Sequence, residues 1–193
     1  MYACEWWPEV RKRVVEVLGL EPRSLLPVGA RLSDDDAKAL HRDGVRWALP
    51  GPFTPLELRF AVSMVLSEGD PEELRIETRV PCSIELEIES ESRAIPAHLT
   101  DLSTGGAFVA LAHPHQEGTV IGLRGMLGGK PVSLQARVAW RTGPHAPSWR
   151  DRGMGVEFER IPLATFDLLR QEIECALDRF RLCARPGALA QTD

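Results

Sequence analysis

This 193-residue sequence lacks long hydrophobic runs, an excess of basic residues and the common enzyme signatures. No stretch reaches the roughly 18 to 20 consecutive apolar residues that a membrane-spanning helix needs. The first residues, which include Glu5, Trp6 and Trp7, do not have the basic start and apolar core of a signal peptide. We therefore expect a cytoplasmic protein, with peripheral membrane attachment through a partner left open.

The charge balance argues against a protein that binds nucleic-acid duplexes. The formal net charge is −5 and the isoelectric point is near 5.6, whereas duplex-binding domains present a basic face. A transcription factor would need a basic face that only the fold reveals. Any bound anion is expected to be small and held locally. The hydrophobic content of 44% is enough for a core, and the length fits one large or two small domains.

Metal-binding and catalytic patterns are also missing from the sequence. The four cysteines show no C-x-x-C or other zinc spacing, so reduced structural thiols are expected. His113 and His115 are close in sequence but have no neighbouring cysteine or carboxylate, and we expect no metal and no cofactor. Without G-x-S-x-G, H-E-x-x-H or Walker motifs, an enzyme would have only these histidines and scattered carboxylates to use. We expect no catalytic residues.

The first seventy residues alternate between helical and extended patterns. Helical spacing of apolar residues predicts a helix from Trp7 to about residue 18, and Ser33 and Thr54 are good N-caps for two more helices. Residues 24–30 and 44–49 have the composition of short buried strands. This alternation is typical of a small α/β module.

Residues 21–66 resemble the second half of a response-regulator receiver domain. The stretch LLPVGARLSDDDAKALHRDGVRWALPGPFTPLEL carries the similarity. Gly29 and Gly51 stand where that family has the Ser or Thr and the Lys that serve its phosphoaspartate. The resemblance therefore implies lost phosphorylation chemistry and a role in dimerisation or partner docking; an unrelated α/β module is the alternative.

The pattern changes to period-two alternation after residue 79. Six short segments alternate or are bounded by turn residues, which predicts a small antiparallel barrel or sandwich. They are residues 80–88, 93–100, 107–111, 119–127, 132–140 and 153–158. Helical spacing beyond Pro162 predicts a terminal helix packed on this barrel, with residues Phe166, Leu169, Ile173, Leu177 and Phe180 sharing one stripe.

Two short motifs around this pattern supply the chemistry of an anion site. Arg75 and Arg79 are four residues apart and offer two planar guanidinium groups to phosphate. The turn Asp101-Leu-Ser-Thr-Gly-Gly106 offers a carboxylate, a hydroxyl and backbone amides. Either motif alone has an ordinary structural explanation. The arginines could pair with neighbouring glutamates, and Asp-x-Ser is common in self-capping turns.

Arg75-x-x-x-Arg79, Asp101-x-Ser103-x-x-Gly106 and Gly153-Met-Gly-Val-Glu-Phe158 together resemble the PilZ domain, a bacterial receptor module for cyclic di-GMP (c-di-GMP). The resemblance covers residues from about 72 to 180. It implies a six-stranded barrel with a C-terminal helix and a ligand wrapped against the barrel by the segment that carries the arginines.

The resemblance also implies a role for each motif residue. Arg75 and Arg79 would bind phosphate or a guanine edge, and Asp101 would accept from guanine N1 and N2. Ser103 would offer its hydroxyl. Gly105 and Gly106 would let the backbone approach the ligand.

Three further positions affect how the ligand is bound. Leu74 stands where some members have another arginine, which favours one ligand per protomer over an intercalated pair. Arg141 and Trp140 end a predicted strand and could extend the site, although we expect Trp140 in the core.

We thus predict an α+β chain with three parts: a receiver-like module (1–70), a PilZ-like barrel (71–183) and a flexible tail (184–193). The predicted function is a non-enzymatic bacterial c-di-GMP effector in which the ligand orders the entry strand that carries Arg75 and Arg79. In this effector the ligand changes how the N-terminal module, a protein partner or a homodimer is arranged. A ligand-independent adaptor in motility or exopolysaccharide control is the alternative.

Overall fold

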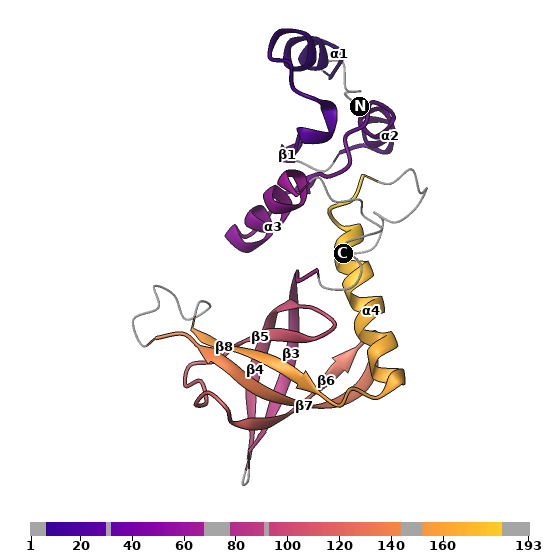
Figure 1. The fold of residues 1–193 in the computed structure, drawn as a ribbon. Coiled ribbons are helices and arrows are strands. Elements are labelled where there is room, and N and C mark those ends of the chain that lie inside the picture. The colour runs from indigo at the N-terminus through magenta and orange to yellow at the C-terminus, as the bar shows by residue number, and fades with distance from the viewer. Residues whose placement is uncertain (1–6, 30–31, 68–77, 91–92, 144–151, 183–193) are drawn as a thin grey trace. The chain divides into compact units, whose positions relative to one another are not determined.

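The computed structural model describes residues 7–29, 32–67, 78–90, 93–143 and 152–182 (Figure 1). The chain forms two compact units. The barrel unit consists of Leu74–Ala176, and the N-terminal unit combines Met1–Glu73 with Leu177–Asp193. The chain therefore passes between the units twice.

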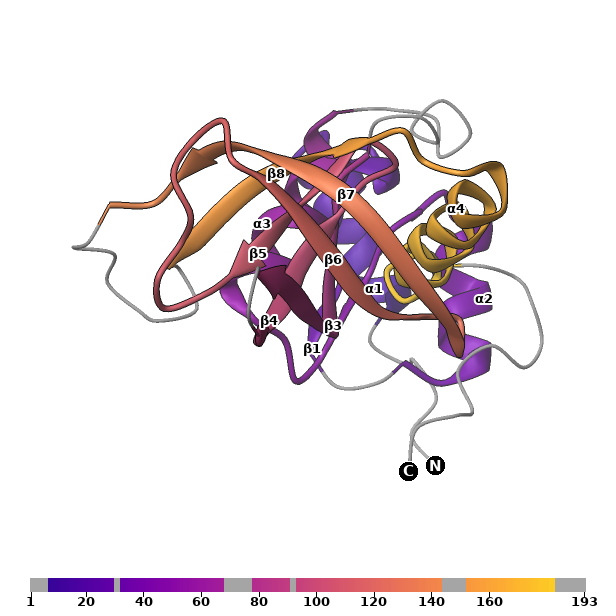
Figure 2. The same ribbon diagram turned by 90° about the horizontal axis from the view of Figure 1, so that it is seen from below.

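Six strands of the barrel unit form a closed antiparallel barrel in the order β3-β4-β5-β8-β7-β6 (Figure 2). Their bounds are β3 Val80–Ser90, β4 Arg93–Leu102, β5 Gly106–Ala110, β6 Val120–Leu127, β7 Lys130–Arg141 and β8 Gly153–Glu159. Buried and exposed residues alternate along β7, whereas every residue of β5 is buried. All six predicted strands are present. This confirms the predicted fold class.

Helix α4, Leu163–Asp178, follows the last strand. Leu169 is 1% exposed and lines an apolar cavity together with barrel residues such as Leu134 and Phe158. At the β6–β7 turn, the Gly128 N–H donates to the Glu172 carboxylate of α4. The predicted apolar stripe of this helix is thereby confirmed where it meets the barrel.

The N-terminal unit consists of short elements. In chain order they are α1 Trp7–Arg11, the π-helix η1 Lys12–Val17, the 3₁₀-helix η2 Pro22–Ser24, β1 Val28–Gly29, α2 Asp34–Arg42, β2 Leu49–Pro50 and α3 Pro55–Leu66. β1 and β2 pair in parallel. Both predicted caps are confirmed: the Asp36 N–H donates to Ser33 Oγ, and Thr54 and Glu57 form a reciprocal capping box.

The two strands predicted in this unit are shorter than expected. β1 covers only two residues, and Val28 is 52% exposed rather than buried. η2 occupies the start of the predicted segment. Pro27 has no N–H to donate to a sheet, although its carbonyl accepts from the Leu49 N–H.

Residues 46–48, just before β2, pair with the end of the chain instead of extending that strand. The Ala48 N–H donates to the Phe180 carbonyl at 2.8 Å, and the Leu182 N–H donates to the Arg46 carbonyl at 2.9 Å. Leu182 also belongs to a buried cluster with Leu40 and Val45. Residues after α4 thus complete the N-terminal unit.

Several predictions fall outside the described residues or stay untested. The predicted tail, 184–193, and the arginine-bearing segment up to residue 77 are not described. The expected domain boundaries stay predictions, since spatial grouping does not test independent folding. Among the described helices, none has both the length and the apolarity needed to span a membrane.

Candidate ligand-binding site

The structure brings the two sequence motifs together at Arg79 and Asp101. Arg79 immediately precedes β3, and Asp101 lies near the end of β4, where it pairs with Pro81 of β3. Arg79 Nη1 lies 3.1 Å from Asp101 Oδ1, and 43% of the arginine side chain is exposed. The glutamates of the alternative explanation, Glu72, Glu73 and Glu77, lie outside the described residues, as do Arg75 and Leu74.

Asp101 is held by the barrel as well as by the arginine. The same Oδ1 atom accepts from the Phe108 backbone N–H at 3.0 Å. Burial raises the pKa of the Asp101 carboxyl above its ordinary value, while the Arg79 guanidinium and the Phe108 N–H oppose this shift. These two bonds fix the carboxylate in position, and both of them use Oδ1 rather than Oδ2.

Next to this carboxylate is a thiol that stays neutral. Burial raises the pKa of the Cys82 thiol to about 12, and the negative charges of Asp101 and Glu172 add to the effect. Its Sγ lies 3.6 Å from the Leu99 carbonyl, to which it can donate. Cys82 therefore contributes packing and no charge to the site.

The Ser103–Gly106 turn is closed by its own hydrogen bonds. The Ser103 N–H and Oγ–H both donate to the Gly106 carbonyl, at 2.8 and 3.1 Å. Ser103 is 9% exposed. This is the self-capping turn that was the alternative for this motif, and its hydroxyl proton is already used within the turn.

The two glycines of this turn differ in their surroundings. A Cβ on Gly106 would lie 2.2 Å from the Val156 carbonyl oxygen of β8, so glycine is needed where β5 and β8 pack. A Cβ on Gly105 would meet nothing within 4 Å, and this residue is exposed. Only Gly105 therefore has the open space that backbone approach to a ligand requires.

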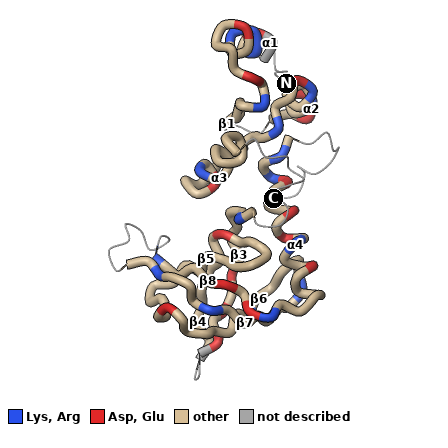
Figure 3. Tube along the Cα trace, in the orientation of Figure 1, with Lys and Arg blue, Asp and Glu red and all other residues tan. Residues whose placement is uncertain are grey.

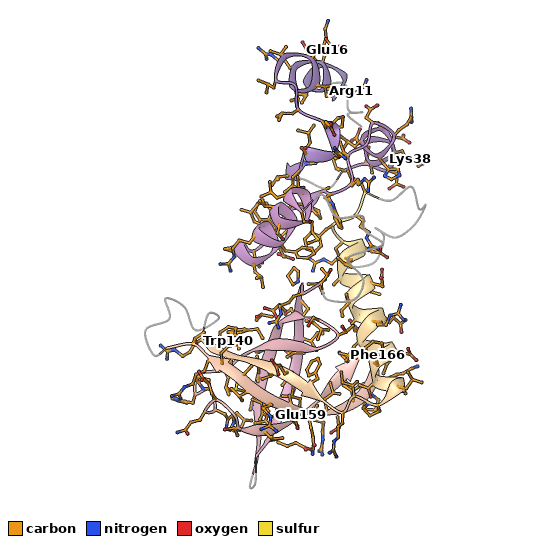
Figure 4. The ribbon with its side chains drawn as sticks, viewed as in Figure 1. Arg11, Glu16, Lys38, Trp140, Glu159 and Phe166 are labelled. Carbon is orange, nitrogen blue, oxygen red and sulfur yellow. The ribbon has the colours of Figure 1, made fainter. Side chains whose placement is uncertain are left out.

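Trp140 lies on the barrel surface, which corrects the expectation that it is a core residue. Alternation along β7 would place Trp140 on the buried face with Leu134, Ala136 and Val138, but the register shifts between Val138 and Trp140. This bulge inserts one extra residue and turns the following side chain to the other face. The Trp140 side chain is 45% exposed and lies beside β8 (Figure 4).

Two residues that were given no role in the site from the sequence support the indole. A Cβ on Gly155 would lie 2.2 Å from Trp140 Nε1, so the ring lies against bare backbone. The Phe108 ring packs against it with centroids 5.5 Å apart. The Gly153-x-Gly155 spacing in a strand was the available signal, since glycines two apart leave one face of a strand open.

These residues form one row across the barrel. Register pairs Asp101 with Phe108, Phe108 with Gly155, and Gly155 with Trp140. A cation and a carboxylate thus lie at one end of the row, and an exposed aromatic ring lies at the other. Arg141, also exposed, follows Trp140 at the end of β7. Such a surface can bind a ligand that has both anionic groups and flat rings.

The described part of the chain also contains the two histidines that were considered for a metal site or for catalysis. There, no three His, Cys, Asp or Glu side chains are grouped to hold a metal ion. His113 is exposed and His115 is half-buried. Basic and acidic residues are interspersed along both units (Figure 3).

The fold is a closed six-stranded antiparallel barrel followed by a helix, and Arg79 meets Asp101 where β3 begins and β4 ends. The sequence matches the PilZ domain family over residues 73–175, which is more than half of the chain. The chain belongs to the PilZ domain family. The match does not reach residues 21–66, so the receiver-like resemblance stays a prediction.

Among the solved structures that are similar to this chain are the following three. The Bacillus subtilis inhibitor of motility MotI/DgrA aligns with TM-score 0.46 and 22% identity, over 53% of this chain and 51% of that chain. The PilZ domain of CeSA from a cellulose-synthesizing bacterium gives 0.40 and 24%, over 50% and 96%. Borreliella burgdorferi PlzA, in complex with c-di-GMP, gives 0.39 and 15%, over 57% and 48%. The chain spans about half the length of MotI/DgrA and PlzA. A search of curated proteins finds no match.

Proposed function

We propose that this chain is a non-enzymatic effector that binds c-di-GMP on the outer surface of its barrel. The observation that carries the proposal is the 3.1 Å contact between Arg79 and Asp101, which unites the two PilZ motifs in one place. Arg79 and Arg75 bind phosphate or a guanine edge, and Asp101 accepts from guanine N1 and N2. Gly105 gives the ligand access to the backbone.

The exposed indole adds a surface for a guanine base. Trp140 is backed by Phe108 and lies in the same cross-strand row as Asp101. Stacking of a base on an aromatic ring is worth about 1 to 3 kcal/mol. Two charge-assisted contacts at about 1.5 to 3 kcal/mol each fall short of the roughly 8 kcal/mol of micromolar binding, so base contacts are needed. We propose one ligand per protomer, with Arg141 near its edge.

Isothermal titration calorimetry of the full chain with c-di-GMP tests this proposal. We expect binding at micromolar ligand, and Arg79→Ala should weaken it by about 10- to 100-fold. Arg137→Ala is the matched control, because Arg137 is 48% exposed and pairs with Glu159 at 2.6 Å on the same barrel. Absence of heat at tens of micromolar ligand, or equal losses in both variants, would contradict the proposal.

We further propose that the bound ligand acts on the connection between the units. Arg75 and Arg79 lie just after the first crossing point of the chain, near residue 73. Holding both arginines on one ligand fixes the segment between them, and this shifts the population of unit arrangements available for docking a protein partner or a second copy. Small-angle scattering should change on addition of c-di-GMP for the natural chain but not for Arg75→Ala/Arg79→Ala.

A ligand-independent adaptor is the second candidate. The observation in its favour is that both motifs already have protein partners, since Arg79 pairs with Asp101 and the Ser103 hydroxyl donates within its own turn. An adaptor would keep its partner after both arginines are replaced. Partner binding that is lost in Arg75→Ala/Arg79→Ala but kept in Arg137→Ala would exclude this candidate.

A further inference from the structure

Helix α3 has a second apolar face that its own unit does not cover. Phe60, Ala61 and Met64 are buried on one side. On the other side, Leu58, Val62 and Leu66 are 37%, 40% and 75% exposed. Their spacing of four residues places them on one ridge along the helix. A helix with an apolar ridge left open to water is suited to a protein contact.

The charges on α3 indicate what kind of surface fits this ridge. Only two residues of the helix are charged, Glu57 and Arg59. Glu57 is 8% exposed and bound to Arg179 at 2.7 Å, so it faces its own unit. Arg59 is exposed and forms no ion pair with any other residue that the structure describes. The open face thus combines three apolar side chains with one cation in the first half of the helix.

We infer that this ridge pairs with the same ridge of a second copy of the chain, in antiparallel orientation. Val62 is then at the two-fold axis, and Leu58 of each copy meets Leu66 of the other. Such a patch is complementary to itself, as a closed dimer requires. Two ridges of this i, i+4 type pack at a crossing angle of about −50°.

Electrostatics selects the antiparallel orientation over the parallel one. A parallel pair would bring the two Arg59 cations together. In the antiparallel pair, Arg59 lies beside the last turn of the other copy's α3, which is the negative end of its helix dipole. One exposed cation is too few for attachment to an anionic membrane, where several basic residues flank an apolar face.

This dimer rests on the proposed function, where a second copy is one of the possible docking partners. Its contact involves no residue of the ligand site. A failed dimer test therefore leaves the ligand titration unaffected, and a failed titration leaves the dimer test unaffected. Because the contact is a single pair of short ridges, we expect reversible association that increases with concentration.

Sedimentation equilibrium of the full chain over a wide concentration range tests the inference. Val62→Glu places two carboxylates at the axis and should raise the dimer dissociation constant by at least about tenfold. Val120→Glu is the matched control, because Val120 is 45% exposed on the barrel unit. A monomer at every concentration, or equal effects of both variants, would overturn the inference.

Disulfide trapping tests the orientation and does not depend on how Val62→Glu folds. In a chain with Cys4, Cys175 and Cys183 replaced by serine, Val62→Cys should cross-link with itself at the axis under mild oxidation. Leu58→Cys alone should not, whereas a mixture of Leu58→Cys and Leu66→Cys should form the mixed dimer. Efficient self-cross-linking of Leu58→Cys, or none in the mixture, would contradict the antiparallel pair.

Discussion

Gly105 and Gly106 are neighbours in one motif but serve different purposes. A Cβ on Gly106 would lie only 2.2 Å from the Val156 carbonyl oxygen of β8. The Gly105 position is open, and its carbonyl accepts from the Phe158 N–H at 2.9 Å without involving a side chain. The second glycine therefore maintains the pairing of β5 with β8, independently of any ligand.

Gly106→Ala should destabilise the barrel, because its methyl group forces β5 away from β8. Overpacking of this kind costs about 1 to 3 kcal/mol. Gly105→Ala is the control and should change the free energy of unfolding by less than about 0.5 kcal/mol. Urea unfolding followed by circular dichroism measures both values. Equal stabilities would show that Gly106 is not needed for packing.

The buried position of Asp101 in the candidate site lowers the free energy of unfolding when its carboxyl is ionised. Folding raises its pKa, chiefly by burial, so the folded state binds this proton more tightly than the unfolded state does. The contribution of this carboxyl to the free energy of unfolding is therefore fully present below its unfolded pKa, near 4, and is lost as pH rises through the folded pKa.

Asp101→Asn removes this titration and keeps an oxygen that can accept from the Phe108 N–H. We expect the variant to gain stability relative to the natural chain at pH 7 and to lose that advantage as the pH falls towards about 4. Thermal melts of both proteins across this range measure the difference. A difference that does not vary with pH would contradict the assigned shift.

At the scale of elements, the sequence pattern predicted the barrel well and the bulges poorly. Alternation is clear in β7, where the interior buries every second residue from Leu134 to Val138, whereas β5 is buried throughout. The register shift after Val138 is not visible, since it depends on the pairing of β7 with β8. Trp140 was therefore expected in the core, and the contribution of Phe108 and Gly155 to the site was missed.

Gly155→Ala should weaken binding of c-di-GMP by displacing the indole that lies against Gly155. The Trp140→Ala variant sets the scale of the effect, about 5- to 150-fold from the loss of one base stack. Gly143→Ala is the control, because a Cβ there meets nothing within 4 Å. Titration calorimetry measures all three. Full affinity in Trp140→Ala would remove the indole from the proposed site.

The residues that follow α4 also form contacts that the sequence pattern did not predict, here within the N-terminal unit. Two strands were expected there from local composition, yet residues 46–48 find their partners at residues 180–182, over 130 positions later. No local pattern reveals such a pairing. The caps at Ser33 and Thr54 were predictable because each depends on residues only three apart.

At the scale of the whole molecule, segments from both ends of the chain form one unit. The N-terminal unit is too small to bury a large core from its own first residues, and it takes Phe180 and Leu182 from the other end of the chain. Phe180 packs on Phe60 with ring centroids 5.0 Å apart, and Arg179 neutralises the buried Glu57. In sequence, the barrel unit therefore lies between the two segments that together form the N-terminal unit.

A chain that ends at Ala176 should keep the barrel and lose the fold of the N-terminal unit. Truncation removes the Arg179–Glu57 pair, the Phe180 ring and both backbone hydrogen bonds to residues 46–48. It also leaves Glu57 buried without its cation, which is strongly destabilising. Hydrogen exchange should show lost protection of α2 and α3, with little change in β3 to β8 and in binding of c-di-GMP.

The matched control for this truncation is a chain that ends at Leu182, which keeps every contact named above. We expect α2 and α3 to be protected in this control as in the full chain. If the chain ending at Ala176 protects them equally, the N-terminal unit folds from residues 1–73 alone. If it instead loses the protection of the barrel strands, the two units do not fold separately, because the barrel then depends on the same six residues.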